Sequence, residues 1–231
     1  SPSWTGDTGS WQIVTSSTAA AGASNSYTIR LNHTVSEAGI QYLSTQITNM
    51  SSSNGHSWSF WLGRRIQAYT AGNSVEIWLY ANESNLESTT VDGYAIFIGD
   101  DSGNDEIRLC YMVDGTISST IITSSTSLVN GLTDIGFMLR VTRSNTGSWS
   151  LYSSALPTSN GSGAIATDIP SSENVNNNLG SWSENSLSIN DNGYFGIIAN
   201  HTSGTDPRQS VEFDQIYFDL KQEKQYREQN E

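Results

Sequence analysis

The acidic segment GDDSGNDE, residues 99–106, has the residue types of a calcium site. Calcium is bound by carboxylate and carbonyl oxygens, and Asp100, Asp101 and Asp105 supply three carboxylates within six positions. The EF-hand pattern fails, because Asp105 stands where that loop requires glycine. Two interpretations follow: a non-EF calcium site built on these three aspartates and backbone carbonyls, or a hairpin turn in which Gly103 takes a positive φ and the acids face water.

A second pair of acids, Glu212 and Asp214, stands two residues apart in VEFDQIYFD, so the two side chains share one face of a strand. Laminarinase-like retaining glycosidases place acids at alternate strand positions, E-x-D-x-E, with nucleophile and acid about 5 Å apart. Here Ile216 occupies the third position, so the acid/base is missing. No G-x-S-x-G, H-E-x-x-H or phosphate-binding glycine loop occurs. We expect a non-catalytic protein, with a glycoside hydrolase or polysaccharide lyase as the alternative.

Composition excludes several other classes. The chain of 231 residues has 23 acidic against 10 basic residues and a net charge of -13, which argues against binding nucleic acid or an anionic membrane. The single cysteine, Cys110, excludes an intramolecular disulfide and a multi-cysteine metal site, and its place in an alternating run indicates a small core residue. No apolar stretch is long enough to span a membrane.

The elements that must position these residues are short runs with a period of two, separated by Gly, Asn, Asp and Ser clusters. Such runs are typical of strands, and helical periodicity is almost absent. The pattern predicts an all-β sandwich or barrel, and at this length a single domain, residues 1–220. The expected strands are 26–31, 42–47, 58–66, 74–80, 93–99, 106–113, 119–123, 135–143, 148–153, 193–200 and 211–220.

Turns and loops can be placed from the same pattern. The sequences VDGT (113–116) and NTGS (145–148) predict tight turns between strands. Residues 157–188 are polar, and we expect an ordered surface loop over one face of the sandwich. The charged segment 221–231 is helix-prone and predicts a short helical or disordered tail, or a linker to a further domain.

Alternation within three strands separates a core face from a second face. If Val75, Ile77 and Leu79 face the core, then the neighbouring residues of that strand project from the opposite face. Aromatic rings beside polar groups suit carbohydrate, because rings stack on C–H faces while polar side chains satisfy hydroxyls. The alternative is that the 157–188 loop covers this face as a second small core. The predicted ligand-binding residues are Glu76, Trp78, Tyr80, Arg108 and Arg140.

The order of the motifs PSWTGDTGSWQI, WSFWLGRRI, YANESNLESTTVDGYAIFIG and FDQIYFD resembles one known module. It is the concanavalin A-like, laminin-G-like jelly-roll module of large secreted Bacteroidetes proteins, some of them linked to type IX secretion. The likeness covers about residues 2–219. It implies a two-sheet antiparallel jelly-roll sandwich in a larger multidomain chain, secreted or at the cell surface. Laminin-G-like domains often carry a calcium at the rim, and no catalytic residues are established for the module.

Together these observations predict a non-catalytic extracellular binding or adhesion module for a glycan or another surface polymer, without membrane insertion. Structural calcium is the only cofactor expected. The alternative from another class is a structural spacer that presents a neighbouring domain of a larger secreted protein.

Overall fold

The computed structural model describes residues 3–14, 28–31, 39–50, 55–64, 74–99, 105–125, 129, 135–154, 177–186, 188–190, 192–201 and 212–221. Within these ranges nearly every element is a strand, and the one exception is a 3-10 turn, η1 (Thr8–Ser10). None of the described segments forms a helix with the length and hydropathy that a membrane span requires.

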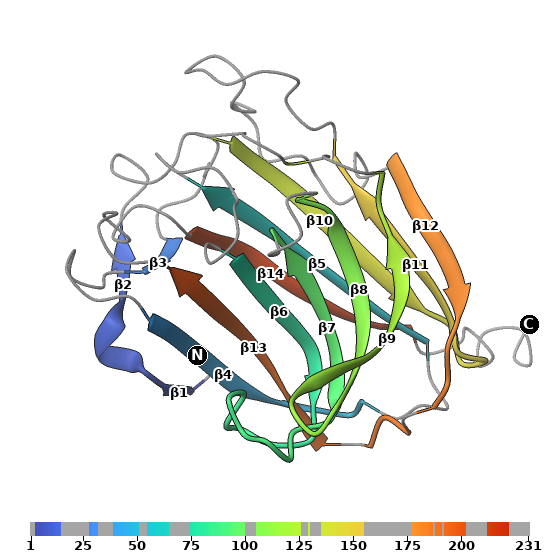
Figure 1. Ribbon diagram of the computed structural model, residues 1–231, viewed down its shortest axis with the longest axis horizontal. Helices are drawn as coiled ribbons and strands as arrows, with labels where there is room; N and C mark the ends of the chain where they lie inside the picture. Colours follow the sequence, from blue (N-terminus) through green and yellow to red (C-terminus); the bar gives the residue numbers. More distant parts are fainter. Residues whose placement is uncertain are drawn as a thin grey trace, which may run out of the picture.

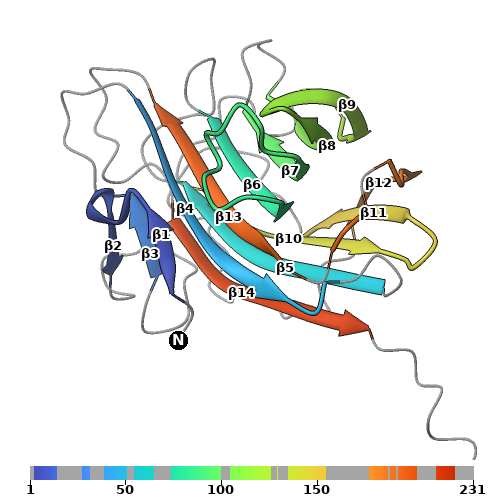
Figure 2. The ribbon, with the colours of Figure 1, turned by 90° about the horizontal axis from the view of Figure 1, so that it is seen from below.

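The strands form two packed antiparallel sheets, seen from two directions in Figures 1 and 2. Sheet A has the order β1-β4-β13-β6-β7-β8-β9 and sheet B the order β12-β11-β10-β5-β14-β3-β2. This arrangement confirms the two-sheet antiparallel sandwich expected from the sequence. The strands of sheet A are β1 (Trp4–Gly6), β4 (Gly39–Thr48), β6 (Ser74–Ala81), β7 (Gly93–Ile98), β8 (Ile107–Val113), β9 (Thr116–Thr123) and β13 (Asn192–His201). Those of sheet B are β2 (Trp11–Val14), β3 (Thr28–Leu31), β5 (Gly55–Arg64), β10 (Ile135–Arg143), β11 (Ser148–Ser153), β12 (Asn177–Ser183) and β14 (Glu212–Lys221).

Each of the eleven expected runs overlaps a strand in the described residues, but β1, β2 and β12 were not predicted. β1 and β2 are short. β12, with the sequence NNLGSWS, contains few residues that favour strands, and it forms because it pairs with β11 along its length. The prediction of a loop over 157–188 is therefore wrong for 177–183, and residues 155–176 lie outside the described part of the chain.

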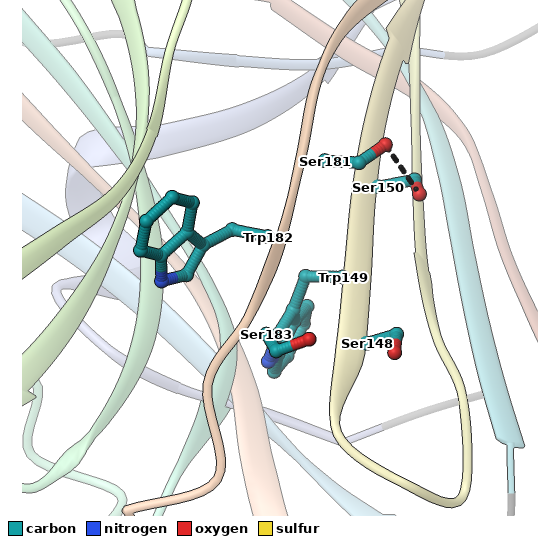
Figure 3. A pocket seen from close by; sticks show the side chains of 6 residues that line it. All are labelled: Ser148, Trp149, Ser150, Ser181, Trp182 and Ser183. Atoms are coloured by element: carbon teal, nitrogen blue, oxygen red, sulfur yellow. Dashed lines mark hydrogen bonds between the residues drawn. The ribbon is translucent and has the colours of Figure 1, made fainter.

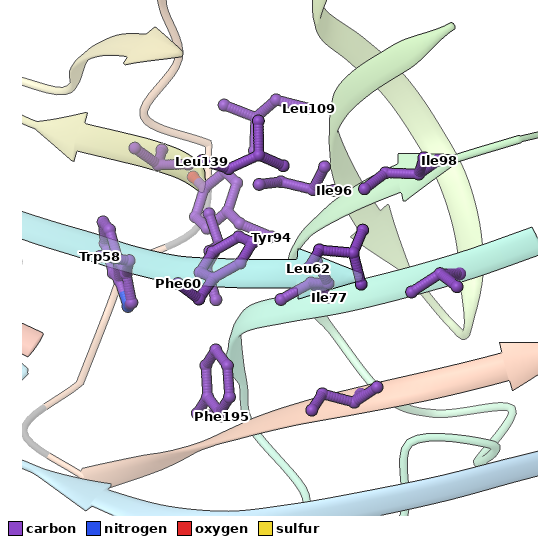
Figure 4. Packing of buried hydrophobic residues seen from close by; sticks show 14 of the residues in the cluster. Trp58, Phe60, Leu62, Ile77, Tyr94, Ile96, Ile98, Leu109, Leu139 and Phe195 are labelled. Carbon is purple, nitrogen blue, oxygen red and sulfur yellow. The ribbon is translucent and has the colours of Figure 1, made fainter. Parts of the chain in front are cut away.

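The main core lies between the sheets, where the alternating apolar residues of both inner faces meet (Figure 4). Val75, Ile77 and Leu79 are all fully buried there, as alternation predicted. At one end of this core the Trp58 and Trp149 rings stack, with centroids 5.8 Å apart and an interplanar angle of 13°. Other labelled members of the cluster in Figure 4 are Phe60, Leu62, Tyr94, Ile96, Ile98, Leu109, Leu139 and Phe195.

Both predicted turns are confirmed. Asp114 and Gly115 join β8 to β9 with φ of 51° and 69°, the two positive values that a type I′ hairpin turn requires. In the second turn Gly147 has a φ of 82°, and its N–H donates to the Ser144 carbonyl at 3.1 Å. At the C-terminal end, β14 includes Lys221, which was expected to begin the tail, and residues 222–231 are not described.

Candidate functional site

The structure distributes the predicted ligand-binding residues over both sheets. Glu76, Trp78 and Tyr80 belong to β6 and Arg108 to β8, all in sheet A, whereas Arg140 belongs to β10 in sheet B. Alternation within single strands cannot tell which of two sheets a residue belongs to. Arg140 therefore does not join the other four residues in one site.

Tyr80 does not lie on the same face as Trp78, contrary to prediction. The pairing of β6 with both neighbours shifts register in this part of the strand, between Trp78 and Tyr80 on the β7 side. A β-bulge of this kind breaks the alternation of faces. As a result Leu79 and Tyr80 both belong to the main core, and the Tyr80 hydroxyl accepts a hydrogen bond from the Asn190 N–H at 3.2 Å.

Trp78 does project from the outer face of sheet A, but it is only 1% exposed. It belongs to a second small core, as the alternative interpretation held, but Tyr80 is not a member and none of the described members comes from the 157–188 loop named as the cover. The described residues that cover it come from the β6–β7 connection, residues 82–92, which contributes Leu86 and Val91. The remaining members of this cluster are Ala81, Ala95, Cys110, Met112 and Ile198, so Cys110 is a buried core residue, as expected.

The 82–92 connection is fastened to the rest of sheet A at several points. The Ser44 hydroxyl on β4 donates to the Ser84 carbonyl at 2.6 Å. On the other side, the Gly115 N–H in the β8–β9 turn donates to the Val91 carbonyl at 2.8 Å. Gly196 on β13 permits close approach, because a Cβ there would overlap Leu86 and the backbone of β4. The connection therefore forms a fixed wall beside the face.

Next to this wall, four half-buried side chains cross the outer face of sheet A in one line. The register pairs residue 42 with 198, 198 with 76, 76 with 97, and 97 with 108. We call Tyr42, Glu76, Phe97 and Arg108 the outer row. It crosses from β4 to β8, four strand spacings or about 19 Å, which is long enough for a short oligosaccharide.

The outer row combines ring faces with hydrogen-bonding groups. Tyr42 and Phe97 pack on the small core around Trp78, which leaves each ring partly exposed. The Arg108 guanidinium lies 5.9 Å from the Phe97 ring centroid. The Trp78 Nε1–H donates to Glu76 Oε2 at 3.1 Å, so the buried indole orients the carboxylate. A surface of this kind can stack on sugar rings and bind their hydroxyls.

Burial raises the pKa of Glu76 from its ordinary value of 4.5 to about 7. The Trp78 hydrogen bond lowers this pKa, and the negative charge of Glu87 raises it further. A raised pKa in the folded state means that protonated Glu76 stabilises the fold. Its contribution is fully present below about pH 4.5 and is lost as the pH rises through about 7.

We therefore expect Glu76→Gln to flatten the dependence of unfolding free energy on pH between these two values. The amplitude of the change is at most about 3 kcal/mol, since one pKa unit corresponds to about 1.4 kcal/mol. Urea unfolding at a series of pH values measures it. Parallel pH profiles for the wild type and the variant would contradict the shifted pKa.

The sequence analysis missed Tyr42 and Phe97. The signal for Phe97 was present, because it alternates with Ile96 and Ile98, both fully buried in the core. Tyr42 alternates in the same way with Leu43. Their alignment with Glu76 depends on β13 lying between β4 and β6, a pairing between distant segments that a local pattern does not contain.

Sheet B offers a second surface, a shallow pocket of about 510 Å³ on β11 and β12. Four serines line it, and the Ser150 and Ser181 hydroxyls lie 3.0 Å apart. Trp182 also lines the pocket, but its ring points away from the serine hydroxyls (Figure 3). Trp149 lines the pocket as well, but it is fully buried and offers no exposed ring face. We therefore prefer the outer row as the candidate site.

The predicted calcium ligands lie mostly outside the described residues. Asp100 and Asp101 are not described, and neither is Gly103. Asp105 is 2% exposed, has a positive φ of 44°, and its carbonyl accepts from the Val129 N–H at 3.2 Å. The described ranges contain no group of three or more His, Cys, Asp or Glu residues that would hold a metal ion. The calcium site stays a prediction.

The paired acids of the enzyme alternative lie on β14. Glu212 pairs with Gly63 and Asp214 with Trp61, and the register shifts after Asp214. The side chains of the two acids are not among those described, so their spacing stays a prediction too.

Comparison with known proteins gives the fold. No family model and no curated protein matches the sequence. Among solved structures, the exoplasmic/lumenal domain of VIP36, in its Ca2+/Man3GlcNAc-bound form, is 14% identical, with 93% of this chain and 84% of that chain covered and a TM-score of 0.53. The Emp47p carbohydrate recognition domain is 9% identical, with 91% and 88% covered and a TM-score of 0.55. A protein of unknown function from Shewanella oneidensis MR-1 is 8% identical, with 94% and 77% covered and a TM-score of 0.58. The chain thus has the lectin-like, concanavalin A-like sandwich fold.

Proposed function

We propose that this chain is a non-catalytic carbohydrate-binding module that holds a glycan along the outer row. The main support for this proposal is the arrangement of side chains on one face of sheet A. Two half-buried rings, Tyr42 and Phe97, lie on either side of the Glu76 carboxylate, which Trp78 orients through a hydrogen bond. Rings supply stacking surface, while Glu76 and Arg108 supply acceptors and donors for sugar hydroxyls. Because the 82–92 wall is fixed by hydrogen bonds to its neighbours, the face is formed before the ligand arrives.

The comparisons support the ligand class. VIP36 was crystallised with Man3GlcNAc, and the Emp47p domain is a carbohydrate recognition domain. The VIP36 domain is exoplasmic or lumenal, which agrees with our proposal that this module is secreted or displayed at the cell surface, within a larger multidomain chain. The resemblance to secreted Bacteroidetes modules supports the same placement.

A glycan array followed by calorimetry tests the binding function. We expect Phe97→Ala to weaken affinity for the best glycan about 30-fold, because truncating a central aromatic typically costs about 2 kcal/mol. The matched control is Tyr152→Ala, which removes another half-buried ring, but from sheet B and away from the outer row. The Arg140 guanidinium lies 4.8 Å from the centroid of this ring. Equal losses of glycan affinity in both variants would mean that the glycan does not bind on the outer row. If no glycan on the array binds, the alternative of a structural spacer is favoured.

Catalysis is tested separately, by release of reducing sugar from β-glucans and alginates. We expect none above the background of a heat-denatured sample. Release that disappears in Glu212→Gln would overturn the non-catalytic assignment.

We also propose that the segment around Asp105 binds a structural calcium ion, with Asp100 and Asp101 as the other carboxylates. VIP36 has been crystallised in Ca2+-bound and metal-free forms, which supports calcium binding in this fold. Calcium at a hundredfold excess over its dissociation constant should stabilise the domain by about 2.7 kcal/mol. Melting curves with calcium and with chelator measure this, and Asp101→Ala with Asp105→Ala should remove the response. Identical wild-type curves in calcium and chelator would exclude the site.

A further inference from the structure

The 82–92 wall runs parallel to the outer row. It is bonded to Ser44 on β4, lies over Gly196 on β13, and is held by the Gly115 N–H at the β8–β9 turn. Ser44 and Gly196 each stand two positions along their strands from the outer row, so they belong to the neighbouring row of the same face. The wall therefore crosses the same strands as the outer row and closes one of its long sides.

On the other long side of the outer row, the described side chains include polar groups. Asn200 on β13 pairs with Ser74 on β6 and with Ile40 on β4, two positions along these strands from the outer row. Asn200 and Ser74 are both half-buried. Their amide and hydroxyl can bind the hydroxyls at the edge of a sugar ring whose face lies on the outer row.

Both ends of the outer row are open in the described part of the chain. Beyond Arg108, its partner on β9 is the small, exposed Thr123. Beyond Tyr42, β1 ends at Gly6, where a Cβ would overlap the Tyr42 ring, so glycine adds no side chain that could close this end. Asp7 bonds to the Tyr42 N–H at 2.9 Å, in the plane of the sheet and not above it. A groove that is open at both ends can hold the interior of a long chain.

The register determines how long a bound chain must be to contact both rings. Neighbouring strands are about 4.8 Å apart, which is close to the length of one pyranose unit in an extended chain. Tyr42 and Phe97 are separated by three such spacings, with Ile198 and Glu76 between them. A chain along the row therefore needs four units to cover both rings. Equatorial linkages, as in β-1,4-linked glucose or mannose, keep such a chain straight.

We propose that the outer row binds the interior of a straight, unbranched β-1,4-linked glycan of four or more units. Tyr42 and Phe97 stack on the first and fourth units, and Glu76 accepts hydrogen bonds from the hydroxyls between them. The wall excludes branches. Because successive units of such a chain face opposite ways, branches on two neighbouring units place one of them against the wall. This inference rests on the proposed function, since it names the ligand class of the same row.

Calorimetry with linear β-1,4-glucan and β-1,4-mannan oligomers of two to six units tests the length requirement. The affinity should rise about tenfold between three and four units, which corresponds to about 1.4 kcal/mol for the second ring. Tyr42→Leu keeps an apolar side chain on the small core but removes the ring, so this step should disappear. The matched control is Tyr194→Leu, which removes a half-buried ring that packs on the same small core from the far side of the wall, and the step should remain. A general loss of affinity in Tyr42→Leu with the step retained would contradict the role of the ring.

The branched probes are the xyloglucan heptasaccharide, with xylose on three consecutive glucose units, and mannopentaose with galactose on two neighbouring units. The branched form of the backbone that binds should bind at least tenfold more weakly than the unbranched form. Equal affinity for both forms, or an affinity that does not depend on length, would overturn this inference and leave glycan binding standing. The same holds if only other glycans of the array bind. If no glycan binds at all, the inference and the proposed function both fail.

Discussion

Trp78→Ala should lower the free energy of unfolding by about 3–5 kcal/mol, the usual cost of truncating a buried tryptophan. The indole is 1% exposed and lies at the centre of the small core between sheet A and the 82–92 wall. Its removal leaves a cavity that Leu86 and Val91 would have to fill, and it also removes the hydrogen bond to Glu76. Urea denaturation of both proteins at neutral pH measures the loss.

Trp78→Phe is the control, because it keeps an aromatic ring and removes only the outer part of the indole and its N–H. We expect a smaller loss of stability than for alanine and, since the Trp78 hydrogen bond lowers the pKa of Glu76, a further rise in that pKa. If Trp78→Ala instead kept the melting temperature of the wild type and abolished glycan binding, Trp78 would belong to the binding surface.

Trp149→Ala should be equally damaging, with an expected loss of about 3–5 kcal/mol. The Trp149 ring is fully buried at the end of the main core, 5.8 Å from Trp58 and 4.6 Å from Tyr94 between centroids. Its Nε1–H also donates to the Glu184 carbonyl at 3.0 Å, so the variant leaves that carbonyl without this donor. Thermal and urea unfolding report the effect.

The molecule provides its own control for this variant. Trp182 is the direct partner of Trp149 across the β11–β12 ladder, but its side chain is 62% exposed (Figure 3). Trp182→Ala should therefore change stability by less than about 0.5 kcal/mol, as exposed substitutions usually do. Similar losses in the two variants would mean that Trp182 is covered in solution.

Much of the fold followed from alternation, because each strand has one face in the core and one outside it. The residues for which this reasoning failed have specific causes. Tyr80 faces the core because β6 has a β-bulge between Trp78 and Tyr80. The bulge adds one residue to the strand and so interrupts the alternation of faces. β12 was missed because its sequence has little strand preference, and pairing with β11 supplies what local sequence does not.

The candidate site was harder to predict than the fold. Glu76 and Arg108 were found because both lie opposite aliphatic residues in their own strands. Their partners were not, because the neighbours of a residue across a sheet depend on strand order. β13 enters between β4 and β6 from a distant part of the chain, and it brings Tyr42 into line with Glu76. Arg140 was grouped with the residues of sheet A because its own strand does not reveal that β10 belongs to sheet B.

The attachments of the 82–92 wall have a consequence for affinity that is independent of any contact with a ligand. Ordering a flexible segment on binding costs roughly 1–2 kcal/mol for each residue. Here the Ser44 hydroxyl and the β8–β9 turn already hold the segment, so that cost falls on folding and not on recognition. Releasing the wall at Ser44 would therefore weaken binding through conformational entropy, with the outer row itself unchanged.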